Sequence, residues 1–142
     1  MSELTPDDLV EIELIKRVKY AYFRNLDLKQ WDEIRELFTE DASASYGGGA
    51  YAFEGRDAIV EFFRAGDQVF VGGGPQMTIG RVVAEGDHVA IEASGTAPLH
   101  NGNTYDNRYH FAIDLRDGRV AAVREYMDSH HVAVTLAPPP EA

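Results

Sequence analysis

The sequence predicts an α+β fold, because a helical pattern fills its first part and a strand pattern its second. Before Gly66, apolar residues recur at steps of three and four, as in helices with one buried face. After Gly66 the period changes to two, and turn sequences separate the segments. We expect three helices packed on one face of an antiparallel sheet. They form one domain over residues 1–136, followed by a disordered tail at 137–142.

The first predicted helix begins at a dense start signal and ends near Asn25. Thr5 can cap it, Pro6 suits the first helical position, and Asp7 and Asp8 lie where the helix dipole favours negative charge. Apolar residues at helical spacing, with charged residues between them, then continue through the segment. We therefore expect one long amphipathic helix.

Two shorter helices follow. Asp27 and Gln30 form a cap-and-N3 pair, after which Trp31 begins an apolar face that runs to Phe38. We expect Trp31 to be mostly buried in the core. The third helical pattern opens at Gly55 and stops at Gly66, a residue suited to helix C-termini.

Four strands are predicted after the helices, over residues 77–83, 88–97, 105–115 and 119–128. The turn sequences Glu-Gly-Asp at 85–87, Asn-Gly at 101–102 and Asp-Gly at 117–118 supply the positive φ that tight hairpins need. The strands are therefore consecutive and antiparallel. The helices cover one face of this sheet and leave the other to solvent or a partner.

Charge argues against two classes of partner. The 142 residues carry 13 Lys and Arg against 24 Asp and Glu, a formal net charge of −11. Such a surface repels nucleic acid and anionic lipid. The first residues show no basic and apolar leader, and no apolar run approaches the roughly 20 residues of a membrane span. We expect a cytoplasmic protein that binds neither nucleic acid nor membrane.

Composition also limits the chemistry. The chain has no cysteine, which excludes disulfides, a thiol nucleophile and thiolate metal sites. His130 and His131 are adjacent, so on an extended chain they would point to opposite faces, and we expect no metal site. The glycine runs at 47–49 and 72–74 do not link a strand to a helix as a phosphate-binding loop does. They are expected to be loops.

The strand that starts at Tyr105 carries the clearest alternation. Its odd positions, which include Tyr109 and Phe111, are mostly apolar, and its even positions are mostly charged. Period two therefore places the odd positions on the buried face. Asn107 is the exception there: a buried amide needs partners or a ligand, because an unpaired buried polar group costs about 1–3 kcal/mol.

Five segments resemble one known family. They are YFRNLDLKQWDE at 22–33, LFTEDA at 37–42, GRDAI at 55–59, DGRV at 117–120 and REYMD at 124–128. Together they span most of the chain and are similar to the SnoaL-like group of the nuclear transport factor 2 superfamily. The resemblance implies a cone-shaped α+β roll, in which helices pack on a strongly curved sheet around a deep apolar pocket. Homodimers through the open sheet face are common in the group.

The resemblance also suggests catalytic residues on the N-terminal side. Asp27 matches an active-site aspartate of scytalone dehydratase and the bile-acid dehydratases, and Tyr22 matches a pocket tyrosine of the latter. Each has a structural alternative, since Asp27 can be a helix cap and Tyr22 a core residue. His100 is a loose match to one dehydratase histidine. The other histidine has no counterpart in the GGGP segment at 72–75.

Other relatives match only in part. Tyr46 stands where ketosteroid isomerases carry their base, and is either an oxyanion donor or a wall residue. In the epoxide hydrolase pattern Glu125 matches the final carboxylate, but Glu92 and a serine replace the other two members. Family matching turns Glu125 and Met127 inward, where the Glu125 carboxyl would either be paired or have a raised pKa in the apolar setting.

The leading prediction is an enzyme that uses general acid and base chemistry without a cofactor on a small, mostly apolar ligand. By resemblance it would be a dehydratase, isomerase or cyclase of polyketide-, terpenoid- or steroid-like compounds. Asp27, alone or through His100, would be the base, with Tyr22 and Tyr46 as donors. The residues expected to bind substrate are Glu92, Asn107, Tyr109, Phe111, Glu125 and Met127. The alternatives are an epoxide-opening hydrolase and a dimeric ligand-binding module.

Overall fold

The computed structural model describes residues 3, 5–7, 9–10, 13, 24 and 28–137. Its helices are α2 (Trp31–Leu37), α3 (Arg56–Arg64) and α4 (Ser129–Leu136), with short 3-10 turns at Gly47–Gly49 and Ala65–Gln68. Its strands are β1 (Phe38–Tyr46), β2 (Tyr51–Glu54), β3 (Gln76–Glu85), β4 (His88–Pro98), β5 (Thr104–Arg116) and β6 (Arg119–Met127). The helix predicted up to Asn25 lies largely outside the described residues. So does the tail at 138–142.

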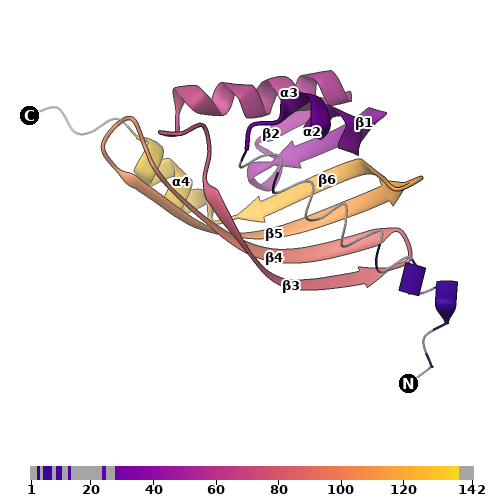
Figure 1. Ribbon diagram of the computed structural model, residues 1–142. Coiled ribbons are helices and arrows are strands. Elements are labelled where there is room, and N and C mark those ends of the chain that lie inside the picture. Colours follow the sequence, from indigo (N-terminus) through magenta and orange to yellow (C-terminus); the bar gives the residue numbers. More distant parts are fainter. Residues whose placement is uncertain are drawn as a thin grey trace, which may run out of the picture.

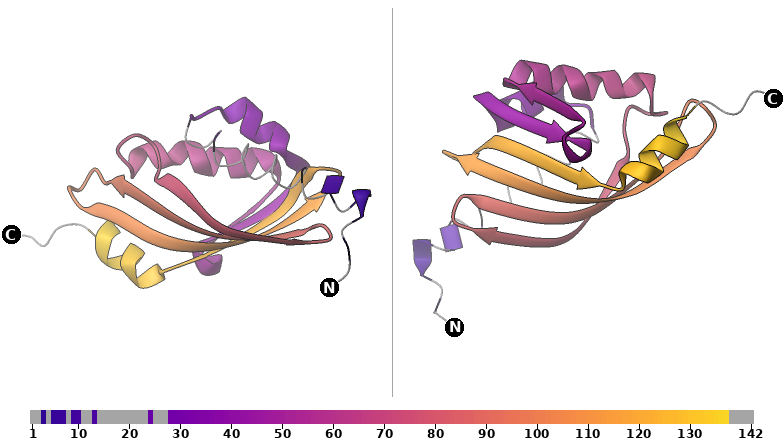
Figure 2. Two further views of the ribbon diagram at one scale, coloured as in Figure 1. Left: turned by 60° about the horizontal axis from the view of Figure 1, so that its bottom comes forward. Right: turned by 180° about the vertical axis from the view of Figure 1, so that it is seen from behind.

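One six-stranded sheet forms the body of the molecule, in the order β2-β1-β6-β5-β4-β3. It curves strongly, and α3 and α2 lie over its concave side (Figure 1). Two further views show the same arrangement, with α2 and α3 in one layer and the sheet in the other (Figure 2). The predicted α+β fold is therefore confirmed.

The four predicted strands are β3 to β6, and they form the expected antiparallel meander. β1 and β2 were not predicted, and β1 pairs with β6 in parallel, so the sheet is mixed rather than wholly antiparallel. The segment that becomes β1 continues directly from α2, and Phe38 opens the strand rather than ending the helix. Phe38 is fully buried as the first residue of β1. An apolar residue at this spacing also fits the buried face of a helix, which is why the sequence pattern extended the helix to Phe38.

The helices α2 and α3 each pack on the sheet through one apolar face. Ile34 of α2 and Ile59 of α3 are fully buried, and Arg35 of α2 forms an ion pair with Asp57 of α3 at 2.7 Å. The N-cap of α2 is Gln30, whose side chain makes no capping hydrogen bond, so Gln30 is not the N3 partner of an Asp27 cap. Trp31 is partly buried and packs against the buried core, so it is less enclosed than Ile34.

The C-terminal helix α4 was also missed. Asp128 is its N-cap, and the Asp128 carboxylate accepts a hydrogen bond from the His131 amide at 3.0 Å. At its other end, the side-chain amides of Asn101 and Asn103 each donate to the Thr135 carbonyl at 2.9 Å. These bonds fix α4 against the β4–β5 hairpin. Within the described part of the chain, no helix is long and apolar enough to cross a membrane.

The two faces of the sheet differ in burial, which gives a matched test of the core. Val123 on β6 is 1% exposed, whereas Val83 on β3 is 57% exposed. We expect Val123→Ala to lower the free energy of unfolding by about 2 kcal/mol, because it removes buried methyl groups and leaves a cavity. Val83→Ala, the same change on the open face, should stay within about 0.5 kcal/mol. Urea titrations of both variants measure this, and equal losses would contradict the assigned core.

Candidate functional site

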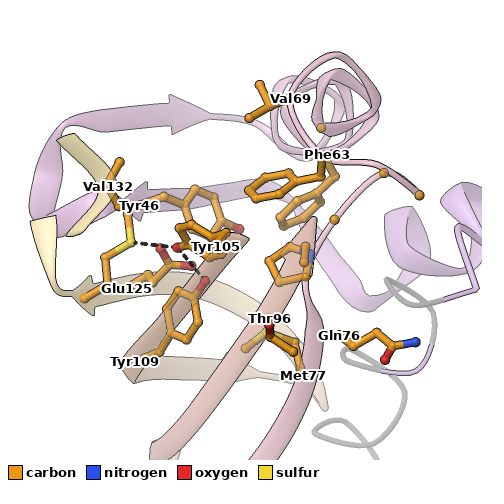
Figure 3. A pocket seen from close by; sticks show the side chains of 18 of the residues that line it. Tyr46, Phe63, Val69, Gln76, Met77, Thr96, Tyr105, Tyr109, Glu125 and Val132 are labelled. Carbon is orange, nitrogen blue, oxygen red and sulfur yellow. Dashed lines mark hydrogen bonds between the residues drawn. The ribbon is translucent and has the colours of Figure 1, made fainter. Parts of the chain in front are cut away.

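A cavity of about 1020 Å³ lies between the concave side of the sheet and the helices. Most of its wall is apolar, and rings contribute much of it (Figure 3). The aromatic residues that line it are Trp31, Tyr46, Tyr51, Phe62, Phe63, Phe70, Tyr105, Tyr109 and Phe111. A cavity of this size and lining suits a mostly apolar organic molecule of drug-like dimensions.

Strand alternation positions the polar groups of this cavity. Tyr105, Tyr109 and Phe111 of β5 point inward, and their even-numbered neighbours point to the outer face. Across the β5–β6 pairing, Phe111 stands opposite Glu125 and Tyr109 opposite Met127. The carboxyl of Glu125 is therefore placed in a wall built mainly of rings and a thioether.

Burial raises the pKa of Glu125 to about 7, since a charged carboxylate loses hydration in this wall. The amide of Gly47 opposes the shift by donating to the Glu125 Oε1 atom at 3.4 Å. Gly47 has φ of 64°, and a Cβ built there would come within 3.2 Å of the Met127 Cε atom. This position therefore favours glycine, which lets the backbone approach the carboxyl.

Two tyrosines meet beside Glu125. The Tyr109 hydroxyl donates to the Tyr105 hydroxyl at 2.6 Å, and the Tyr105 hydroxyl donates to the Met127 sulfur at 3.4 Å (Figure 3). Burial is the main cause that raises the pKa of both phenols. Both hydroxyls therefore stay protonated at neutral pH and can serve as hydrogen-bond donors.

Tyr46 ends β1 and lies in the aromatic wall. Its ring stacks on Phe62 with centroids 5.0 Å apart and packs edge-on against Phe63 at 5.5 Å. The side chain is buried and lines the cavity. Tyr46 is therefore a residue of the cavity wall. That its hydroxyl also donates a hydrogen bond to a substrate oxygen stays a prediction.

Of the residues predicted for the pocket, five line it: Tyr46, Tyr109, Phe111, Glu125 and Met127. Glu92 does not. It is exposed on the outer face of β4, between the inward residues Ile91 and Ala93. Its placement in the pocket was wrong, because Ile91 and Ala93 take the inward positions of β4 and successive side chains of a strand point to opposite faces.

Two further predicted residues are also placed elsewhere. His100 is exposed in the turn after β4, where its Nε2 atom lies 3.0 Å from the Asp67 carbonyl. Asn107 is buried, but it hydrogen-bonds to protein atoms and does not line the cavity. Tyr22 and Asp27 lie outside the described residues, so their roles stay predictions.

Sequence reasoning missed parts of the rim and wall. Val132 and Leu136 of α4 line the cavity, as do Phe62 and Phe63 of α3 and Gln76 of β3. A signal for α4 was available, because Asp128 stands before a short apolar helical pattern and Asp is a preferred N-cap. Gly47, which reaches Glu125 from another strand end, has no signal in a single sequence.

Residues 20–123 match the family model described as SnoaL-like domain. The chain belongs to this family. A candidate SnoaL-like polyketide cyclase from Jannaschia sp. CCS1 is a similar structure, with 21% identity, 99% of this chain and 100% of that chain covered, and a TM-score of 0.77.

Two other solved structures share the fold of this SnoaL-like domain. A candidate isomerase from Bacillus subtilis has 22% identity and a TM-score of 0.75, with 88% of this chain and 94% of that chain covered. A LEH-like epoxide hydrolase of M. tuberculosis has 19% identity and a TM-score of 0.71, with 84% and 86% covered. At these identities the similarity establishes the nuclear transport factor 2-like fold alone.

The raised pKa of Glu125 has a consequence for stability. Its pKa is about 7 in the folded SnoaL-like domain, against an ordinary value of 4.5. Between these values the folded state binds more protons than the unfolded state, so the contribution of Glu125 to stability falls as pH rises. Glu125→Gln removes this dependence. We therefore expect the variant to gain roughly 2.5 kcal/mol relative to wild type between pH 5 and pH 8.

Urea titrations of both proteins at the two pH values measure this gain. Glu92→Gln is the matched control, because it makes the same change on the exposed face and should leave the difference near zero. A Glu125→Gln curve parallel to wild type across this range would contradict a buried carboxyl with a raised pKa.

Proposed function

We propose that this SnoaL-like protein is an enzyme that moves protons on a small, mostly apolar organic substrate, as a lyase, isomerase or cyclase that needs no cofactor. The observation that carries the proposal is the Glu125 carboxyl, which stands in an aromatic cavity with a pKa of about 7. Near neutral pH both of its protonation states are populated, which suits a general acid or base. A module that only binds an apolar ligand needs no such group.

The proposed roles follow from position. Glu125 takes a proton from a carbon of the substrate or gives one back, and the Tyr105 and Tyr109 hydroxyls stabilise negative charge that develops on a substrate oxygen. Phe62, Phe63 and Tyr46 hold the substrate skeleton and exclude water. This scheme moves the base from Asp27 and His100 to Glu125, since His100 lies outside the cavity. Asp27 and Tyr22 remain candidate contributors.

The epoxide hydrolase alternative is less well supported. Its chemistry requires several inward polar residues around a water molecule, and Glu92, which replaces one member of the epoxide hydrolase pattern, is exposed on the opposite face of the sheet. Glu125 alone could activate water, but the wall around it is built mostly from rings and thioethers. The similarity to a LEH-like epoxide hydrolase supports the shared fold.

Exchange of protons next to a carbonyl tests the proposal without the natural substrate. We expect the wild-type protein to accelerate the exchange of the α protons of 2-tetralone for deuterons from D2O. Proton NMR at pD near 7 measures the rate of this exchange. Glu125→Gln should lower the protein-dependent rate by about a hundredfold or more, the usual effect of a positioned acid or base. The rate should rise with pD through an apparent pKa near 7 when Glu125 acts as the base.

Glu92→Gln is the control on the exposed face and should keep the wild-type rate. Asp27→Asn completes the set, because the amide is close to the carboxylate in size and shape, so a loss of rate there would come from the lost charge. An acceleration that persists in Glu125→Gln, or its absence from the wild-type protein, would contradict Glu125 as the proton-transferring group.

We also propose a homodimer formed through the outer face of the sheet. That face carries exposed Arg108, His110 and Tyr126, and a cluster in which His88 and Arg124 both contact Asp114 at 2.8 and 2.9 Å. Cations and a carboxylate on one face allow two copies to pair about a twofold axis, with the cations of one copy facing the carboxylate of the other. Static light scattering at micromolar concentration should give twice 15.7 kDa.

Tyr126→Asp puts a new charge on this face and should shift the mass toward the monomer, with no change at the cavity. A wild-type mass near 15.7 kDa would contradict the dimer.

A further inference from the structure

The hydrogen bonds around the two pocket tyrosines have a defined direction. The Tyr105 oxygen lies 2.6 Å from the Tyr109 oxygen and 3.1 Å from the Asn107 Nδ2 atom. Tyr105 and Tyr109 line the cavity, and Asn107 stands between them on β5, 1% exposed. A hydroxyl oxygen can accept two hydrogen bonds and donate one, so the neighbours of Tyr105 decide which of these it offers to a ligand.

The backbone fixes which end of the Asn107 amide faces Tyr105. The Oδ1 atom accepts from the amides of Arg108 at 2.8 Å and Asp128 at 3.1 Å, and the Nδ2 atom donates to the Asp128 carbonyl at 3.2 Å. The reversed amide would set its NH2 group against two N–H donors. The donor end of Asn107 therefore points at Tyr105, whose oxygen must accept.

One hydroxyl proton of the tyrosine pair is left without a strong acceptor in the protein. The two hydroxyls carry two protons, and one of them forms the bond between the rings. Asn107 occupies one lone pair of Tyr105, and in the observed arrangement Tyr109 occupies the other. The remaining proton points at the Met127 sulfur at 3.4 Å, which is a weak acceptor. A ligand oxygen would be a better acceptor than this thioether.

We propose that Asn107 is a positioning residue that makes the Tyr105–Tyr109 pair a donor site for one ligand oxygen. The pocket then selects apolar ligands that carry an acceptor oxygen, such as a ketone, over hydrocarbons of the same shape. This rests on the proposed function in one respect, because it assigns the substrate oxygen of the same pocket. It does not depend on proton transfer by Glu125.

Two near-isosteric probes test the selection. 2-Acetylnaphthalene and 2-isopropenylnaphthalene differ in a carbonyl oxygen against a methylene group. Binding is followed at pH 8 by quenching of Trp31, the single tryptophan of the chain, which lines the cavity. We expect the wild-type protein to bind the ketone about tenfold more tightly, the usual effect of one hydrogen bond in an apolar site.

Asn107→Asp is the decisive variant. At pH 8 the introduced carboxylate accepts the Tyr105 proton, while Tyr109 still donates to Tyr105. Both hydroxyl protons are then used inside the protein, and the preference for the ketone should disappear. Gln68→Glu makes the same amide-to-carboxylate change at an exposed position outside the cavity and should keep the tenfold preference.

Two variants keep the test valid if Asn107→Asp does not fold, which thermal melts will show. Asn107→Leu retains an apolar side chain of similar size and should reduce the preference to about threefold, because the freed Tyr105 oxygen lets the hydroxyls turn. The double variant Tyr105→Phe and Tyr109→Phe should bind both probes equally.

Equal binding of the two probes by the wild-type protein, or an unchanged preference in folded Asn107 variants, overturns the inference. Glu125→Gln separates it from the proposed catalysis: the ketone preference should persist there even though proton exchange is lost. Failure of the wild-type protein to bind either probe overturns the apolar ligand pocket and this inference with it.

Discussion

The alternation of β5 is the constraint on which the site depends. This strand pairs with β4 on one side and β6 on the other along most of its length, so its register sets the facing of both neighbours. Tyr105, Asn107 and Tyr109 face inward because Phe111 and Ile113 must be buried on the same side. A slip of one residue would exchange the aromatic wall for the charged outer face. The register of β5 thus fixes both the packing of the core and the lining of the cavity.

Curvature turns that wall into a cavity. The sheet bends around α3, and the ring stack of Tyr46, Phe62 and Phe63 closes the space between them (Figures 1 and 3). At the other end Val132 and Leu136 of α4 complete the lining. Asn107 connects these features, because its amide binds both the Tyr105 hydroxyl and the backbone of Asp128, which caps α4. Asn107 therefore positions both the N-terminus of α4 at the rim and the Tyr105 hydroxyl inside the cavity.

The sequence predicts those parts of the structure that have a strong local pattern of apolar residues and turns. Four strands and the inward set of β5 were predictable, since long alternating segments with Asn-Gly and Asp-Gly turns leave one solution. β1 was not, because its parallel pairing with β6 joins segments far apart in the chain. Glu92 was misplaced because the match to relatives put it in the pocket, whereas the alternation of β4 buries Ile91 and Ala93 and turns Glu92 to the outer face. The Gly47 contact with Glu125 depends on tertiary approach alone.

The energetics of Glu125 support the proposed catalytic role of its carboxyl. Above its pKa of about 7 the folded protein holds a charged carboxyl in an apolar wall, with the Gly47 amide at 3.4 Å as a compensating donor. Relative to the ordinary value of 4.5, this costs about 3 kcal/mol at alkaline pH, a large fraction of the stability of a small domain. An amide or an aliphatic residue would fill the same position without that cost. Groups that lower stability in this way are concentrated where chemistry needs them, and the carboxyl stands beside two protonated phenols that share the cavity. A proton acceptor and a hydroxyl donor on one wall are what the removal of a proton next to a carbonyl requires, whereas a binding module would be more stable without the carboxyl.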